Sequence, residues 1–85
     1  MTYEIFIEKC AQQALSRIAK PDQDRIAAAI RRLADEPRPD GVKKLSGREA
    51  WRIRVGDYRI LYEIDDEQLV ILIIDIGHRR EVYRR

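Results

Sequence analysis

The sequence predicts an α+β fold, in which an N-terminal strand and a helical hairpin precede an antiparallel sheet, in the order β-α-α-β-β-β. Two patterns support this prediction. Apolar residues recur at helical spacing between residues 11 and 33. From residue 51 to 62 they alternate with basic or polar residues on both sides of Gly56-Asp57. A chain of 85 residues can bury a modest core, so we expect a single domain over residues 1–85.

The N-terminal half predicts one strand and two helices. Residues 2–7 alternate in the manner of a strand. Two apolar stripes at i, i+4 and i+7 follow: Ala11, Leu15 and Ile18, then Ile26, Ile30 and Leu33. We expect Pro21 to end the first helix and Asp22 to cap the second. Cys10 is the single cysteine, and we expect it to fill the core rather than act as a nucleophile.

Residues 51–62 predict a hairpin at the centre of the sheet. Gly followed by Asp suits the two central positions of a type II′ turn. With the turn at Gly56-Asp57, the buried face would hold three facing pairs: Val55 with Tyr58, Ile53 with Ile60, and Trp51 with Tyr62. We therefore expect the aromatic residues of the hairpin to pack in the core beneath the helices.

The same register gathers arginines on the opposite face of the hairpin. Arg54 would lie directly across from Arg59, with Arg52 one step along the strand. Like charges directly opposite each other destabilise a sheet. A surface that stacks three guanidinium groups therefore indicates a site for an anion.

The last strand is expected to be central. Residues 69–74 are apolar at every position, which is typical of a strand covered on both faces. Residues 65–67 should form the turn before it, and Gly77 should break it. Leu61, Leu72 and Ile74 would then give the arginines an apolar floor, so that the site is a shallow cleft.

Positive charge is clustered although the net charge is only +2. Residues 42–60 hold six basic and two acidic side chains, and residues 79–85 hold four basic and one acidic. Such a patch on a nearly neutral chain is typical of proteins that bind polyanions. The alternative is a solvated charged surface without a partner.

Several classes of site and location are excluded by missing motifs. The sequence has no phosphate-binding glycine loop, no dinucleotide fingerprint and no pair of histidines at metal-ligand spacing. We expect no metal or cofactor, so a nuclease would depend on the 2′-hydroxyl of RNA as an internal nucleophile. We also expect no signal peptide and no membrane-spanning helix, and a cytoplasmic location.

Three side chains near the C-terminus complete the candidate site. Arg79 follows the last strand and would lie near Arg59. Tyr83 offers a stacking surface for an unpaired base, or it simply packs the C-terminal tail. His78 is a candidate for proton transfer, since the unperturbed pKa of histidine as a residue type is near neutrality, or it is a surface histidine at a strand end.

Three stretches closely resemble the RelE/ParE toxin superfamily, on its RelE side: residues 44–47, 51–64 and 76–83. The resemblance extends over essentially the whole chain. It implies two helices on an antiparallel sheet and a toxin of a bacterial or archaeal type II toxin–antitoxin pair. RelE-like members cut mRNA in the ribosomal A site, without metal, by 2′-hydroxyl attack.

The resemblance also implies roles for individual residues. Arg59 matches the arginine that stabilises the phosphate, and Arg79 the arginine assigned to the transition state and leaving group. Tyr83 matches the tyrosine that stacks on and orients the substrate.

One feature departs from the resemblance, because Arg52 and Arg54 stand where the best-known members carry two lysines, one of them proposed as the general base. Arginine is effectively always protonated, so both can hold phosphate but are poor bases. His78 is our substitute for the base, ahead of Glu49.

The expected function is therefore a ribosome-dependent endoribonuclease toxin. Its partners would be a cognate antitoxin that covers the basic cleft, the ribosome and mRNA, with operator DNA reached only through the antitoxin. Further RNA contacts are expected from Lys43, Lys44, Arg48 and Arg80. Two alternatives are a ParE-like toxin that inhibits DNA gyrase without cutting RNA, and an inactive relative that only binds antitoxin.

Overall fold

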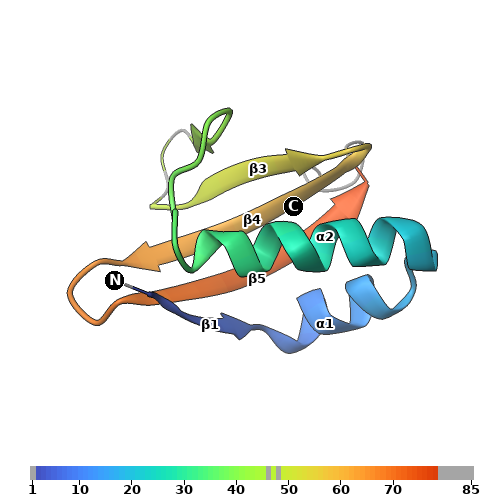
Figure 1. Ribbon diagram of the computed structural model, residues 1–85, viewed down its shortest axis with the longest axis horizontal. Helices are drawn as coiled ribbons and strands as arrows, with labels where there is room; N and C mark the ends of the chain where they lie inside the picture. The colour runs from blue at the N-terminus through green and yellow to red at the C-terminus, as the bar shows by residue number, and fades with distance from the viewer. Residues whose placement is uncertain (1, 46, 48, 79–85) are drawn as a thin grey trace.

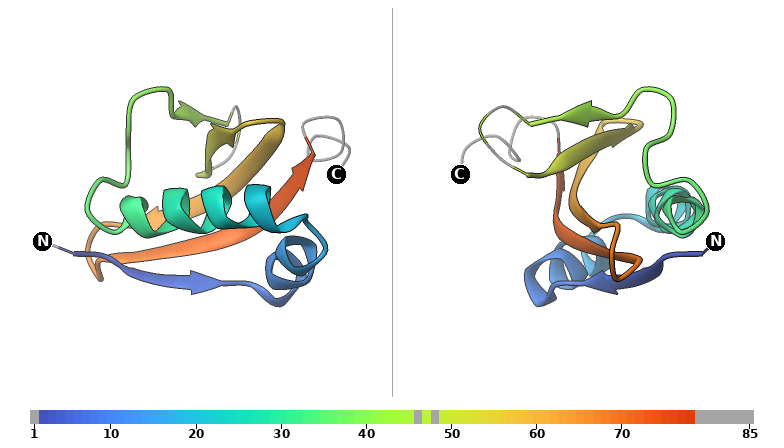
Figure 2. Two further views of the ribbon diagram at one scale, coloured as in Figure 1. Left: turned by 45° about the vertical axis from the view of Figure 1, so that its right-hand side comes forward. Right: turned by 90° about the vertical axis from the view of Figure 1, so that its left-hand side faces the viewer.

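The computed structural model describes residues 2–45, 47 and 49–78 of the chain. Its elements in order are β1 (Glu4–Ile7), α1 (Lys9–Ser16), α2 (Lys20–Leu33), β2 (Lys43–Lys44), β3 (Trp51–Val55), β4 (Tyr58–Asp65) and β5 (Val70–His78). The strands form one sheet in the order β1-β5-β4-β3-β2, and α2 lies across it (Figure 1). The twisted sheet curves around α2 (Figure 2). The predicted α+β fold is confirmed.

The core lies between the helices and one face of the sheet. Both predicted helical stripes supply it, through Ala11, Ile26, Ile30 and Leu33. The sheet contributes Ile53, Ile60, Tyr62, Ile71, Ile73 and Ile76. Full burial of a side chain of this size stabilises the fold by about 1.5–3 kcal/mol. The hydroxyl of Tyr62 donates a hydrogen bond to the carbonyl oxygen of Pro37 at 2.7 Å, and burial raises the pKa of Tyr62.

The boundary between the two helices lies earlier in the sequence than predicted. α1 ends at Ser16, and α2 begins at Lys20 after the N-cap Ala19. Pro21 therefore lies in the first turn of a helix instead of ending one. Backbone N–H groups in the first turn have no acceptor within the helix, so proline, which has no N–H, costs no hydrogen bond there. Asp22 lies inside that turn, where negative charge is favourable, and forms an ion pair with Arg25.

Cys10 is exposed, so the prediction of a core cysteine was wrong. Its thiol donates a hydrogen bond to the carbonyl oxygen of Ile74 at 3.4 Å. Ala11 is the completely buried residue at this end of α1. Successive residues of a helix differ by about 100° in direction, which separates the environments of these two neighbours.

The hairpin register is confirmed at every predicted pair of β3 and β4. Gly56 has a φ of +60°, and Asp57 is not among the residues with positive φ. This combination is the type II′ turn, which favours glycine at its first central position. Register and turn together place alternate side chains of both strands on the core face.

The rest of the sheet includes pairings that the sequence analysis did not predict. β1 runs parallel to β5, and the basic segment before the hairpin contains the short strand β2. β5 begins one residue later than expected, because Leu69 lies in the turn with a φ of +57°. Gly77 does not break β5 but pairs with Arg59 inside it.

A β-bulge changes the phase of β5. Tyr62 pairs with Ile73, whereas the preceding residue Leu61 pairs with Asp75, so Ile74 is the extra residue. A bulge moves the residues beyond it to the opposite faces. Ile76 therefore enters the core, and Asp75 lies on the face away from the helices.

Polar contacts join the turn between β4 and β5 to the segments before β1 and after α2. The hydroxyl of Tyr3 donates a hydrogen bond to Asp66 at 2.6 Å, and the guanidinium of Arg38 donates two at 2.9 and 3.3 Å. The same guanidinium lies 5.0 Å from the ring centroid of Trp51. These bonds, first Arg38 and then Tyr3, lower the pKa of Asp66. No helix in the described part of the chain is long and apolar enough to cross a membrane.

Replacing Asp66 with Asn should lower the melting temperature near neutral pH. Because the folded pKa is depressed, the carboxylate stabilises the fold above its unfolded pKa of about 3.9. This contribution is lost as pH falls through the lower folded pKa. Thermal unfolding as a function of pH should show a gap between variant and wild type that closes in acid. The exposed neighbour Glu67→Gln is the control, and an equal gap for both variants would contradict the assignment.

Candidate nucleic-acid interface

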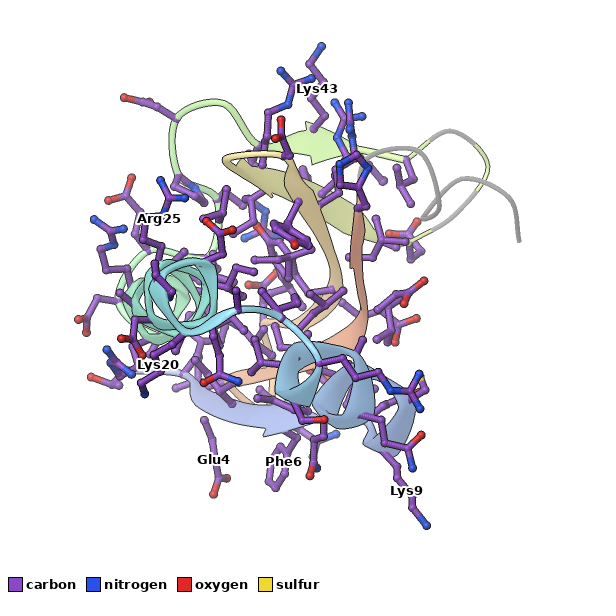
Figure 3. All side chains as sticks on the ribbon, turned by 90° about the vertical axis from the view of Figure 1, so that its right-hand side faces the viewer. Glu4, Phe6, Lys9, Lys20, Arg25 and Lys43 are labelled. Atoms are coloured by element: carbon purple, nitrogen blue, oxygen red, sulfur yellow. The ribbon has the colours of Figure 1, made fainter. Side chains whose placement is uncertain are left out.

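Four cations lie on the face of the sheet that points away from the core. Arg54 pairs directly with Arg59 across β3 and β4, as predicted. Arg52 lies on the same face, and its partner on β2 is Lys43. The structure thus adds Lys43 to the arginines, and we call Lys43, Arg52, Arg54 and Arg59 the basic face. Figure 3 shows Lys43 at one end of the molecule and Phe6 at the other.

The basic face is only partly open to water. Lys43 and Arg54 are exposed, whereas Arg52 and Arg59 are half-buried. Leu61 lies between Arg52 and β5 on this face and is 5% exposed. Guanidinium groups bind phosphate through two parallel hydrogen bonds and keep their charge. Partial burial strengthens their attraction for an anion, so this face suits a phosphate group.

Lys44 and Glu49 do not belong to the basic face. Lys44 pairs with Trp51, on the other face of the hairpin, and its ammonium lies 5.9 Å from the centroid of the indole ring. The same ammonium lies 3.5 Å from the carboxylate of Glu49. These placements argue against the RNA contact predicted for Lys44 and against Glu49 as a base beside Arg59.

His78 lies against the aromatic side of the hairpin. It pairs with Tyr58, and the two rings meet edge to face with centroids 5.9 Å apart. Tyr58 packs with the core, on the face opposite Arg59. His78 is adjacent to Gly77, the partner of Arg59, but its ring does not share the basic face by this register.

Four predicted site residues lie outside the described part of the chain: Arg48, Arg79, Arg80 and Tyr83. Their roles stay predictions. Among the described residues, no group of three or more histidine, cysteine, aspartate or glutamate side chains could hold a metal ion.

Asp75 is a buried carboxylate beside the basic face that the sequence analysis missed. It is 5% exposed and shares the face of Leu61 and the arginines. Paired residues form a row across the sheet from β2 to β5, which consists of Lys43, Arg52, Leu61 and Asp75. The available signal was a single carboxylate between Ile74 and Ile76 in an otherwise apolar strand. Because burial of a charge is costly without compensation, that carboxylate indicates a specific role.

A cavity of about 980 Å³ lies between α2 and β3. The residues that line it include the basic residues Arg25, Arg32, Arg52 and Arg54 and the acidic residues Asp35, Glu36 and Asp40. The small residues Ala28 and Ala29 form part of the helical wall. The predicted apolar floor of Leu61, Leu72 and Ile74 is not part of this cavity, which instead adjoins the basic face at β3.

Known proteins resemble this chain over most of its length. The model of the family described as the ParE toxin of type II toxin–antitoxin systems, parDE, matches residues 5–83. A RelE-like toxin protein of Escherichia coli is 25% identical over 81 residues, which cover 93% of this chain and 85% of the relative.

Two crystal structures show the same fold. A chain of the archaeal RelE–RelB complex from Pyrococcus horikoshii has a TM-score of 0.84 and 32% identity, with 96% of this chain and 100% of the other covered. A chain of the toxin–antitoxin complex RelBE2 from Mycobacterium tuberculosis has a TM-score of 0.82 and 26% identity, with 93% and 100% covered.

Removing one charge from the facing arginine pair should stabilise the protein. Arg54→Gln should raise the free energy of unfolding by about 0.5 kcal/mol at low salt, because like charges face each other there. The gain should shrink at high salt, which screens exposed charges. Chemical denaturation at two salt concentrations measures it. Arg17→Gln, at the C-terminal end of α1, is the control, and an equal gain there would contradict the explanation.

Proposed function

Since this chain belongs to the ParE toxin family of type II toxin–antitoxin systems, in the RelE/ParE superfamily, we propose that it is an endoribonuclease that cuts mRNA in the ribosomal A site without a metal ion. The observation that supports this function is the basic face, where three arginines of the hairpin and a lysine of β2 gather on one side of the sheet. A sugar–phosphate backbone is the polyanion that such a face fits best.

The proposed reaction uses only groups of the RNA and the protein. The 2′-hydroxyl loses its proton and attacks the adjacent phosphorus, and the bond from phosphorus to the 5′-oxygen breaks. The products are a 2′,3′-cyclic phosphate and a 5′-hydroxyl, after a proton reaches the leaving oxygen. Extra negative charge develops on the phosphoryl oxygens in the transition state, and fixed cations placed there lower the barrier.

We assign Arg59 to the stabilisation of this negative charge on the phosphoryl oxygens. It is half-buried and lies next to Arg54 and Gly77 in the sheet. Arg52, Arg54 and Lys43 then hold the neighbouring phosphates. Arg79 and Tyr83 keep their proposed roles at the leaving group and in stacking on the substrate.

Removal of the 2′-hydroxyl proton needs a group other than the arginines, which stay protonated. His78 is our candidate because imidazole is the side chain that most often transfers protons in enzymes. It lies at the end of β5 beside Gly77. From its place against Tyr58, the ring would have to reach the substrate around the strand end.

A cognate antitoxin is the proposed protein partner. Both crystal structures described above are complexes of a toxin with an antitoxin. An antitoxin segment with acidic and apolar side chains would fit the cavity between α2 and β3, whose arginines continue onto the basic face. Occupation of this cavity and cover of the basic face would keep the toxin inactive, and operator DNA would be bound through the antitoxin.

Inhibition of DNA gyrase is the second candidate function. It is favoured by the matching family, which is named for ParE. Inhibition of gyrase does not explain the basic face, and we therefore prefer cleavage of RNA. The two functions differ in the nucleic acid that is damaged, and a purified assay separates them.

In a purified translation system the wild type should cut mRNA within the A-site codon. Arg59→Ala and Arg79→Ala should each lower the cleavage rate by about 100-fold or more, because each removes a charge that stabilises the transition state. Primer extension on the mRNA measures the cleavage. Arg17→Ala, on an exposed residue at the end of α1, is the control and should cut at the wild-type rate.

Two outcomes of these assays would contradict the proposed endoribonuclease function. Intact mRNA at every codon, together with blocked supercoiling by purified gyrase, would replace this function with the second candidate. Absence of both activities, with antitoxin binding retained, would identify an inactive relative.

A further inference from the structure

Asp75 is a buried carboxylate for which the reaction described above has no task. It is 5% exposed and lies on the face of the sheet that holds the arginines. We propose that Asp75 is a positioning residue that orients the guanidinium of Arg59 toward the scissile phosphate. This inference rests on the proposed endoribonuclease function.

The bulge in β5 is what brings Asp75 to this face. In a regular strand, Asp75 would share the core side with Ile73, because residues two positions apart lie on the same face. With the bulge, Ile76 is in the core instead and Asp75 pairs with Leu61. Bulges are common beside active sites, where they redirect a side chain.

Arg59 lies within reach of Asp75. Its direct partner on β5 is Gly77, two residues beyond Asp75 on the same face. Diagonal neighbours of this kind are separated by about 7–8 Å between backbone positions, which long side chains span. The residue of β5 directly opposite Arg59 is Gly77, which has no side chain to occupy this part of the face.

The charges on either side favour one direction for Arg59. Arg54 lies directly opposite on β3 and repels the guanidinium away from that strand. Asp75 attracts it toward β5, in a partly buried setting where charge interactions are stronger than in water. Arg52 is on the far side of Leu61 from Asp75. Arg59 is thus the basic side chain best placed to compensate the buried carboxylate.

An arginine held this way is oriented before the substrate arrives. Its orientation costs no further entropy in the transition state, so loss of Asp75 should slow the chemical step more than it weakens binding. A purely structural role would instead change stability alone. The two roles therefore differ in which kinetic constant responds.

The test compares Asp75→Asn with Glu63→Gln. Glu63 is an exposed carboxylate on the same face of the neighbouring strand β4, so its variant removes the same charge away from Arg59. In the ribosomal cleavage assay, Asp75→Asn should lower kcat by about 10-fold with KM nearly unchanged. Glu63→Gln should cut at the wild-type rate. In an Arg59→Ala background, Asp75→Asn should cause no further loss, because residues that act as a unit are not additive.

A second readout does not depend on cleavage. Heteronuclear NMR of the arginine Nε–H groups should show Arg59 more rigid than the exposed Arg54 in the wild type. Asp75→Asn should abolish this difference. If the wild type does not cut RNA, the proposed function fails, and the NMR result still decides whether Asp75 holds the side chain of Arg59.

Two results would overturn the inference. One is an Asp75→Asn variant that cuts at the wild-type rate. The other is an Arg59 Nε–H group as mobile as that of Arg54 in the wild type, a comparison that holds even if the Asp75 variant does not fold.

Discussion

The facing pair of Arg54 and Arg59 is the constraint on which the candidate site depends. The two arginines face each other across β3 and β4 because the opposite face of the same hairpin is buried. A shift of one residue would bring the arginines into the core and expose Ile53 and Ile60. Burial of the apolar face therefore fixes a charge arrangement that would not form by itself. An anion bound to the exposed face relieves the repulsion, which links the fold to the function.

The elements around the hairpin each restrict this surface further. β2 extends it by bringing Lys43 beside Arg52. β5 limits it on the other side, where Gly77 leaves space and Asp75 brings a buried negative charge. α2 supports the core face from below and forms a cavity with β3 that adjoins the same arginines. A toxin needs one surface for its target and one for its inhibitor, and here both would include Arg52 and Arg54.

Local patterns in the sequence predicted much of this structure. The hairpin register, the apolar stripes of both helices and the shared face of the three arginines follow from periodicity and turn chemistry alone. Periodicity did not reveal the bulge at Ile74, because strand alternation assumes one residue per position, and Asp75 was therefore overlooked. The parallel pairing of β1 with β5 is a contact between distant segments, which local patterns do not specify. Pro21 was misplaced because proline suits both the end and the first turn of a helix.

A cryo-electron microscopy structure of the protein on a ribosome tests the central claim most directly. An mRNA methylated at the 2′-oxygen of the A-site codon would bind without being cut, since its nucleophile is blocked. We expect the guanidinium of Arg59 within hydrogen-bond distance of the scissile phosphate, with Arg52 and Arg54 on the neighbouring phosphates. An mRNA bound elsewhere on the protein, with the three arginines facing solvent, would contradict the account.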